Sequence, residues 1–190
     1  MPDNKTLNLG CGKDIREGYT NVDITNYSGV DMVIDLGQTP WPWPDNSIDG
    51  IRAAHLIEHF PEQKWFINEC LRVLKKGGYL ELYLPHSSSI SSVGCLGHYR
   101  TFSYNTMNAY LGEDFYMFGK AKFKTIKQEL RWWYDSFDTQ EELSGWMIPF
   151  IKSANYILTR LAKLSPRICE NLWCYWIGGF REVVWVGEKL

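Results

Sequence analysis

The sequence predicts a single α/β domain built on a mostly parallel sheet. Three observations lead to this prediction. The first 85 residues alternate short apolar strands with turns and a helix, the first strand runs directly into Gly10-Cys11-Gly12, and the next two strands each end near an aspartate. Strands and a helix in this rhythm favour parallel neighbours joined by right-handed crossovers.

In the first half, one helix is expected among five strands. Residues 61–74 place Trp65, Cys70 and Leu74 at helical spacing, with a proline in the first turn and Gly77-Gly78 as the stop signal. We therefore expect an amphipathic helix there. The predicted strands of this half span residues 6–9, 19–24, 31–36, 47–54 and 79–84.

The second half is less regular. Its serine- and glycine-rich start predicts a loop, and a long apolar periodicity later predicts an amphipathic helix entered at Pro149. The expected elements are a loop at 86–97, a short helix at 103–111, a strand at 120–133, a helix at 144–164 and a strand at 182–186.

Composition excludes several classes of protein. With 190 residues, one domain spanning 1–190 is expected, and a net charge of −2 argues against a nucleic-acid-coating protein. An apolar content of 45% excludes intrinsic disorder. The five cysteines contain no C-x-x-C pair, so neither a disulfide framework nor a zinc site is indicated. A polar start and the lack of a long apolar run predict a cytoplasmic protein.

The glycine turn, Gly10-Cys11-Gly12, is the first candidate ligand site. Because Gly10 and Gly12 lack side chains, this backbone can approach a ligand closely. Asp23 can accept hydrogen bonds from ribose hydroxyls, and Asp35 with the backbone of Leu36 can meet an exocyclic amine. Together they predict a nucleoside site at the carboxyl edge of the sheet. The alternative for each aspartate is a turn or helix cap.

A series of motifs between residues 7 and 78 resembles a known family. The motifs are Leu7-Asn-Leu-Gly-Cys-Gly12, Gly18-Tyr-Thr-Asn-Val-Asp23, Asp35-Leu36, Pro40-Trp-Pro-Trp-Pro-Asp-Asn-Ser-Ile-Asp49, His55-Leu-Ile-Glu-His59 and Glu69-Cys-Leu-Arg-Val-Leu-Lys-Lys-Gly-Gly78. In this order they resemble the small type 11 group of class I S-adenosylmethionine-dependent methyltransferases. The resemblance implies a Rossmann-like, seven-stranded, mostly parallel sheet with helices on both faces. Residues 1–85 would then bind the cofactor, and 86–190 would supply acceptor-side insertions and the final strands.

The same resemblance assigns the cofactor contacts. S-adenosylmethionine would lie with its methionine portion over the glycine turn, its ribose at Asp23 and its adenine between Asp35 and Leu36, and S-adenosylhomocysteine would be the product. The residues implied to bind the cofactor are Asn8, Gly10, Cys11, Gly12, Asp23, Ile24, Asp35, Leu36 and His55.

Three departures from the family pattern matter. Asn8 stands where the glycine motif usually begins with an acid, and Asp14 stands at the third glycine position. Asp23 follows Gly12 by 11 residues, whereas a dinucleotide-binding fold places its ribose acid about 20 residues on. The first helix is therefore expected to be short or missing, and a nicotinamide-dependent oxidoreductase is disfavoured.

Histidines are the candidate catalytic groups. The sulfonium is an activated methyl donor, so positioning and removal of one proton can suffice. His98 lies in the loop expected to cover the site and is predicted as an acceptor-side base or binder, with a surface histidine as the alternative. His55 follows the fourth strand and is the second candidate.

Metal binding is the other reading of the segment around His55. In some quinone-pathway O-methyltransferases a related Glu-x-x-Glu-His stretch binds a divalent metal, but His55 replaces its first glutamate here. A glutamate and histidine entering a helix more often form a cap or a core hydrogen bond. The sequence therefore predicts no metal for His55, Glu58 and His59.

The acceptor is expected to be a small molecule or saccharide methylated on oxygen, because the late insertions carry no nucleic-acid signature. Residues 146–167 contain four basic residues and no acid, so they could lie on an anionic membrane, pack on the sheet or form a homodimer contact. Trp41 and Trp43 could line the adenine or fill the core. A non-catalytic module that binds the cofactor and acts through a partner is the alternative function.

Overall fold

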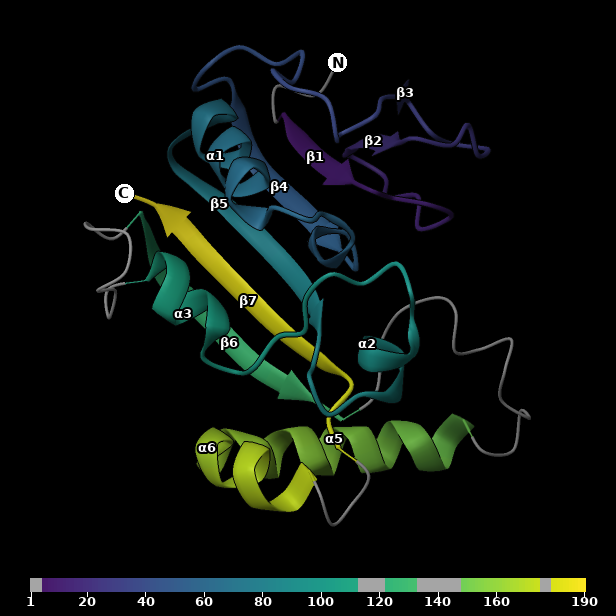
Figure 1. Ribbon diagram of the computed structural model, residues 1–190, viewed down its shortest axis with the longest axis vertical. Helices are drawn as coiled ribbons and strands as arrows, with labels where there is room; N and C mark the ends of the chain where they lie inside the picture. The colour runs from purple at the N-terminus through teal and green to yellow at the C-terminus, as the bar shows by residue number, and fades with distance from the viewer. Residues whose placement is uncertain (1–4, 113–121, 133–147, 175–178) are drawn as a thin grey trace.

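A computed structural model describes residues 5–112, 122–132, 148–174 and 179–190, and within them seven strands form one sheet (Figure 1). The strands are β1 (Thr6–Leu9), β2 (Thr20–Asp23), β3 (Met32–Val33), β4 (Ile48–Ala54), β5 (Leu74–Pro85), β6 (Phe123–Arg131) and β7 (Glu182–Lys189). The helices are η1 (Ile57–His59), α1 (Gln63–Val73), α2 (Ile90–Gly94), α3 (Thr106–Leu111), α5 (Ile148–Leu164), α6 (Pro166–Ile168) and η2 (Cys169–Trp173).

The strand order is β3-β2-β1-β4-β5-β7-β6. The first five strands of this order are parallel, and β7 runs antiparallel to both β5 and β6. Chain order reverses between β1 and β4, which is the point where open α/β sheets bind ligands. The predicted seven-stranded, mostly parallel sheet is therefore confirmed. Residues 10–19 form turns, so the expected loss of the first helix is confirmed as well.

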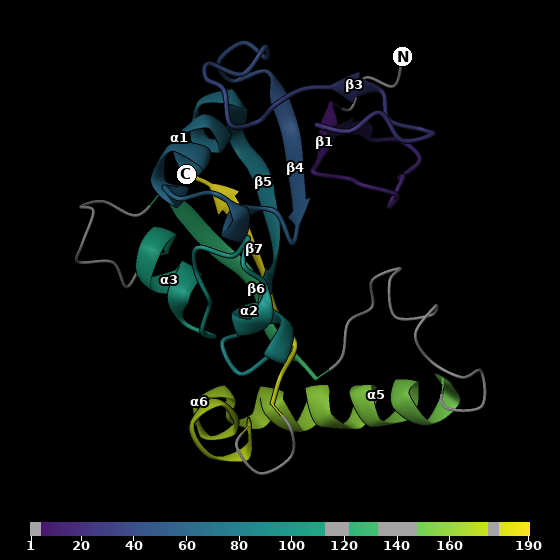
Figure 2. The same ribbon diagram turned by 45° about the vertical axis from the view of Figure 1, so that its right-hand side comes forward.

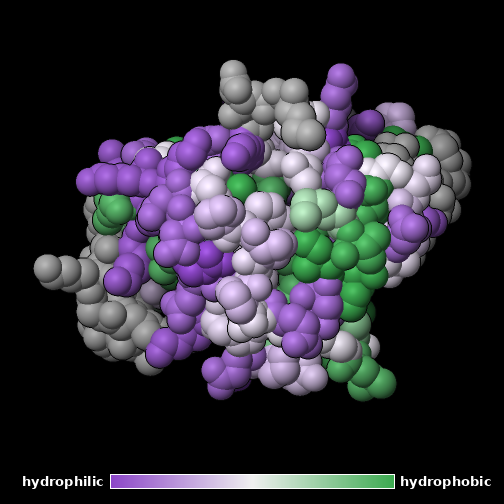
Figure 3. All heavy atoms as spheres, turned by 90° about the horizontal axis from the view of Figure 1, so that it is seen from above, coloured by the Kyte–Doolittle hydropathy of each residue, from purple (hydrophilic) through white to green (hydrophobic). Residues whose placement is uncertain are grey.

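Apolar packing covers one face of the sheet. Figure 2 shows α1 and α3 on the same side, and their residues Phe66, Cys70, Met107 and Leu111 join the core cluster. The sheet contributes its alternate apolar residues to this core: Leu7, Leu9, Ile51, Ala53, Leu80, Leu82, Leu84, Leu130, Val183 and Trp185. The opposite face meets α5 at the β6 edge, where Lys163 lies 3.0 Å from Glu129. Seen from above, hydrophilic residues gather on one side of the molecule and a continuous apolar patch lies on the other (Figure 3).

Two expected elements differ from the structure. The helix of the first half ends at Val73, because Leu74 already pairs with Ile48 as the first residue of β5. The glycines expected to stop it lie inside β5 instead, where Gly77 has φ +78° and the β4 pairing shifts register. The expected loop at 86–97 contains the short helix α2.

The strand expected over 31–36 is shorter than predicted, since β3 is limited to Met32–Val33. The remaining expectations are met closely. α3 and β6 lie within their predicted ranges, and α5 carries Pro149 in its first turn. Residues 120–121, 133 and 144–147 of the predicted elements lie outside the described residues. None of the five cysteines, all of which lie in the described residues, forms a disulfide bond. Within the part of the chain that the structure describes, no helix is long and apolar enough to cross a membrane.

Candidate functional site

The glycine turn follows β1 at the carboxyl edge of the sheet. Gly10 and Gly12 have φ angles of +62° and +51°, which side-chain-bearing residues rarely adopt. A Cβ at Gly10 would lie 2.7 Å from Cδ1 of Leu56, whereas a Cβ at Gly12 would meet open space. Gly10 thus permits close packing against the segment after β4, and Gly12 leaves room for a ligand over the turn.

Asp23 fixes this turn to the neighbouring strand. Its Oδ2 accepts a hydrogen bond from the backbone N–H of Gly12 at 2.8 Å, and its Oδ1 accepts one from Thr25 N at 2.9 Å. The backbone N–H of Cys11 donates to the Val22 carbonyl at 3.1 Å. A carboxylate has about four lone-pair sites, so Asp23 can still accept hydrogen bonds from a ligand. The structure brings the predicted methionine and ribose sites together.

The predicted adenine residues lie on an exposed turn after β3. Oδ1 of Asp35 accepts from Gly37 N at 2.8 Å, which is the geometry of a turn-forming aspartate. Leu36 is buried, and its carbonyl accepts a hydrogen bond from Trp41 Nε1 at 3.2 Å. Trp41 is itself buried against Phe66, with ring centroids 5.3 Å apart. This burial favours the core-packing alternative for Trp41.

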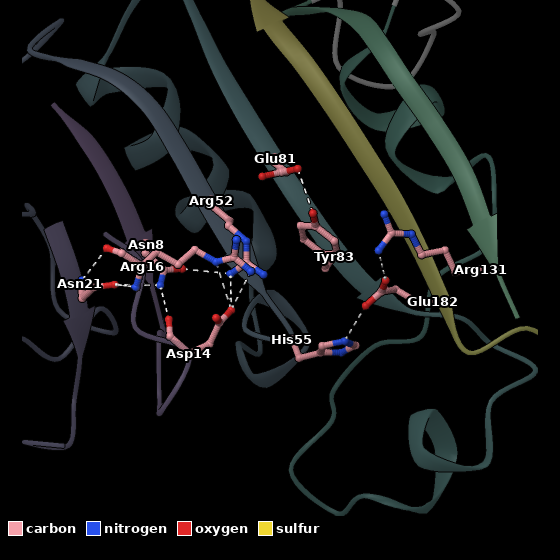
Figure 4. Close-up of polar contacts among 10 residues, drawn as sticks. All are labelled: Asn8, Asp14, Arg16, Asn21, Arg52, His55, Glu81, Tyr83, Arg131 and Glu182. Atoms are coloured by element: carbon pink, nitrogen blue, oxygen red, sulfur yellow. Dashed lines mark hydrogen bonds and ion pairs between the residues drawn. The ribbon is translucent and has the colours of Figure 1, made fainter. Parts of the chain in front are cut away.

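The side chain of Asn8 supports the segment that follows β1 (Figure 4). Its side chain is fully buried, and its Nδ2 donates to the Asp14 carbonyl at 2.7 Å and to Asn21 Oδ1 at 3.1 Å. Its Oδ1 accepts from Arg52 Nη1 at 3.0 Å, and the same nitrogen pairs with Asp14 Oδ2 at 3.1 Å. Asn8 therefore positions the segment after β1, while its predicted contact with the cofactor stays a prediction.

His55 lies just beyond β4 in a left-handed conformation, with φ +50°. Its Nε2 is 3.0 Å from Glu182 Oε1, and its Nδ1 is 3.5 Å from Glu58 Oε1. Burial alone would lower the pKa of His55, but these two carboxylates outweigh it and raise the pKa to about 10. The imidazole therefore holds its proton near neutral pH and places a positive charge at this edge of the sheet.

A polar network on the open sheet face was missed by the sequence reasoning. Figure 4 shows its side chains lying along one face from β1 toward β6. The ring of Tyr83 has the guanidinium of Arg52 at 4.7 Å and that of Arg131 at 5.5 Å from its centroid. Burial and the nearby Glu81 carboxylate raise the pKa of Tyr83. The alternation of polar and apolar residues in Tyr79-Leu-Glu-Leu-Tyr-Leu84 was the signal that could have revealed this face.

His98 is held against η1. Its Nδ1 lies 3.2 Å from the Ser92 carbonyl, and the next residue, Tyr99, donates its N–H to the Glu58 carbonyl at 2.8 Å. The rings of His98 and His59 are 4.8 Å apart between centroids. Since Glu58 also contacts His55, the structure gathers both predicted catalytic histidines around one glutamate.

Comparison with known proteins agrees with this geometry. The family model described as a methyltransferase domain, type 11, matches residues 7–82, which contain the turn, Asp23 and His55. A curated S-adenosylmethionine-dependent methyltransferase from Mycolicibacterium smegmatis is 31% identical over 77 residues, or 40% of this chain. The match spans 26% of that relative, about a quarter of its length.

Solved structures share the fold. A SAM-dependent methyltransferase from Archaeoglobus fulgidus has a TM-score of 0.58 at 19% identity, covering 99% of this chain and 87% of that one. A SAM-dependent methyltransferase from Thermotoga maritima has a TM-score of 0.56 at 16% identity, covering 100% and 84%. The strand order and the glycine turn are those of the class I methyltransferase fold, and residues 7–82 match the type 11 methyltransferase domain.

Proposed function

We propose that the protein transfers the methyl group of S-adenosylmethionine to an oxygen of a small molecule or saccharide. One observation carries the proposal: the hydrogen bond from Gly12 N to Asp23 Oδ2 joins the turn after β1 to the ribose-binding candidate on β2, beside the switch point of the sheet. The division into a cofactor half, 1–85, and an acceptor half, 86–190, is part of this proposal. It is supported by the end of the family match at residue 82.

The chain's own residues have three tasks in such a reaction. The backbone of the glycine turn and Asp23 hold the donor, so that the methyl group is presented in line with the acceptor oxygen. His55 keeps a positive charge beside the site, because Glu182 and Glu58 stabilise its protonated form. His98 is our candidate for the group that meets the acceptor, as its base or its binder.

Calorimetric titration tests the cofactor assignment. The purified protein is titrated in parallel with S-adenosylmethionine, S-adenosylhomocysteine and NAD. We expect micromolar binding of the first two and no heat with NAD, followed by transfer of labelled methyl groups in a screen of hydroxylated small molecules and saccharides. Binding of the cofactor without transfer to any acceptor would favour the non-catalytic module. Binding of NAD alone would contradict the proposal.

We further propose that α5 contacts an anionic membrane surface. Phe150, Ile157, Leu161 and Leu164 follow one another at helical spacing and are 71%, 56%, 37% and 81% exposed. Ile151 and Ala162, on the opposite side of the helix, are buried. Figure 1 shows α5 at one end of the molecule, at the carboxyl edge of the parallel strands.

The charge of this segment supports a lipid surface as the partner of the apolar stripe. Residues 148–168 contain four basic residues and no acid; Lys163 pairs with Glu129 of β6, which leaves Lys152, Arg160 and Arg167. An anionic lipid surface complements such a helix, whereas a second copy would bring like charges together. The finding suits an acceptor that is dissolved in, or attached to, a lipid layer.

Sedimentation with vesicles tests this contact. We expect the protein to bind phosphatidylserine-containing vesicles, to bind pure phosphatidylcholine vesicles far less, and to lose binding in the double variant Phe150→Ser and Leu164→Ser. Ile126→Ser is the matched control, because this exposed apolar residue lies on β6. Equal binding by the double variant, or a dimer that the same two substitutions dissolve, would overturn the proposal.

A further inference from the structure

The carboxylate of Glu58 lies buried beside three histidines. Its side chain is completely buried in η1, and among the described residues neither carboxylate oxygen has a hydrogen-bond partner. The Nδ1 atom of His55 lies 3.5 Å from Oε1, but the other nitrogen of that ring is engaged by Glu182 at 3.0 Å. A buried carboxylate that lacks hydrogen-bond donors keeps a large desolvation cost. A cation bound at Glu58 would offset it.

Two histidines beside Glu58 have the tautomer that ligand binding needs. Nδ1 of His59 lies 3.1 Å from the Gly97 carbonyl, and Nδ1 of His98 lies 3.2 Å from the Ser92 carbonyl. A carbonyl only accepts hydrogen bonds, so each Nδ1 must be the donor, and a neutral ring then carries its lone pair on Nε2. Histidines that bind metals characteristically donate their second nitrogen to a backbone carbonyl or carboxylate in this way.

We propose that Glu58, His59 and His98 form a binding site for a divalent transition-metal ion. One candidate ligand atom from each of the three residues lies within 4.8 Å of the others. Glu58 and His59 come from η1, and His98 comes from the loop after α2, which the Tyr99 N–H to Glu58 carbonyl bond holds in place at 2.8 Å. The protein therefore brings the three side chains together before any ion binds.

The ligand set selects the kind of ion. Two imidazoles and one carboxylate suit Zn²⁺, Fe²⁺ or Co²⁺, whereas Mg²⁺ and Ca²⁺ prefer oxygen ligands throughout. Three protein ligands leave coordination positions open, as in metal sites that bind a further oxygen ligand. The metal site does not depend on the proposed methyl transfer. In that reaction, however, His98 would bind the acceptor through the ion and would not act as a base.

The ligands Glu58, His59 and His98 differ from the set that the sequence suggested. His55 stood there beside Glu58 and His59, whereas in the structure His55 contacts both Glu182 and Glu58, and His98, 39 residues after His59, completes the group. On the sequence, His98 was a candidate acceptor-side base or binder in the loop over the site, and nothing connected it with Glu58 and His59.

Cobalt titration tests the site, since Co²⁺ reports its own coordination through visible absorption. The full chain is freed of metal with a chelator and titrated with Co²⁺, and Zn²⁺ is then added. We expect one Co²⁺ per chain, a visible spectrum of nitrogen and oxygen coordination, and displacement by Zn²⁺. Both His98→Gln and His59→Gln should weaken Co²⁺ binding by at least about tenfold. Loss of a group that only holds a metal ligand in place already lowers metal affinity by about tenfold or more.

Cys95→Ser is the control, because this exposed thiol nearby could bind cobalt by itself. The control should bind Co²⁺ as the unaltered protein does, and all variants should show the same thermal unfolding temperature without metal. His59 is exposed whereas His98 is half-buried, so the His59 variant is the safer of the two for folding. Failure to bind one Co²⁺ per chain, unchanged affinity in His98→Gln, or loss of binding in Cys95→Ser would each overturn the proposal.

Discussion

Asp23 connects two neighbouring strands through hydrogen bonds from Gly12 and Thr25. A single carboxylate thereby orders the glycine turn and keeps lone pairs available for a ligand. The histidines work in a comparable way, since His55 gains its stable charge from Glu182 and Glu58 rather than from its own position in the sequence. At the scale of single residues, the site is made of groups whose properties are set by partners on other elements.

Replacing Asp23 tests its ribose-binding role. Asp23→Ala should weaken the binding of S-adenosylhomocysteine by about tenfold, or about 1.4 kcal/mol, because two hydroxyl partners and the anchor of Gly12 are lost together. Calorimetric titration measures the dissociation constant. Glu62→Ala, an exposed acid at the start of α1, should bind as the unaltered protein does. Unchanged affinity in Asp23→Ala would refute the ribose role.

The attachment of α5 to β6 depends on one buried acid. Glu129 is 3.0 Å from Lys127 and 3.0 Å from Lys163, and its pKa is lowered to about 2 because these two cations and Arg131 outweigh the effect of burial. An acid whose pKa is lowered on folding stabilises the protein above its unfolded pKa, here 4.5, and this contribution disappears as the pH falls toward 2.

Glu129→Gln should therefore reduce the free energy of unfolding at pH 7 by about 1–3 kcal/mol. The difference from the unaltered protein should stay constant down to about pH 4.5 and shrink below it, as Glu129 itself becomes protonated. Urea unfolding at several pH values between 7 and 3 measures this difference. Glu62→Gln is the control. A difference that grows as the pH falls would contradict the ion-pair explanation.

Gly187 on β7 lies where the core face of the sheet is tightly packed. A Cβ at Gly187 would overlap the ring of Trp185, which is fully buried, and would lie 3.0 Å from Phe123 Cβ. Gly187→Ala should lower the free energy of unfolding by about 1–3 kcal/mol, because the ring has no space to move away. Gly94→Ala is the matched control, since a Cβ there meets open space. Equal stability of the two variants in urea would contradict this prediction.

At the scale of the whole molecule, cofactor binding and folding are linked. Only the folded sheet places the glycine turn beside Asp23, so a ligand of this site stabilises the native state. S-adenosylhomocysteine at one hundred times its dissociation constant should raise the free energy of unfolding by about 2.7 kcal/mol, and at the same concentration Asp23→Ala should gain only about 1.4 kcal/mol.

Thermal unfolding with and without ligand checks this linkage. NAD at the same concentration should leave the unfolding temperature unchanged, because the nicotinamide class was disfavoured by the short interval between Gly12 and Asp23. Stabilisation by NAD but not by S-adenosylhomocysteine would contradict the assigned cofactor class.

The donor site and the exposed apolar face of α5 are separate surfaces of the molecule. The carboxyl edge of the parallel strands carries the glycine turn, Asp23 and His55, and Figure 1 places α2 and α5 at the same end. α5 itself contacts β6, the edge strand that lies across the sheet from β1 and β2.

Local sequence signals determined much of the fold. Strand and helix positions follow from side-chain periodicity, which is a property of each segment alone, and the turn at Gly10 to Gly12 follows from the freedom of glycine. The predicted helix ends one residue early, at Val73 instead of Leu74, because Leu74 pairs with β4 as the first residue of β5. Asp23 and the turn could be assigned together because adjacent parallel strands bring their carboxyl ends to one edge.

The tertiary structure alone decided the partners of these residues. Glu182 lies 127 residues after His55, and their contact exists because β7 inserts beside β5 with one particular register. The same holds for His98 beside Glu58, which depends on how a loop folds back onto η1. Sequence periodicity fixes which face of an element a side chain occupies, but charge, proton state and ligand geometry depend on neighbours that only strand order and loop packing bring into contact.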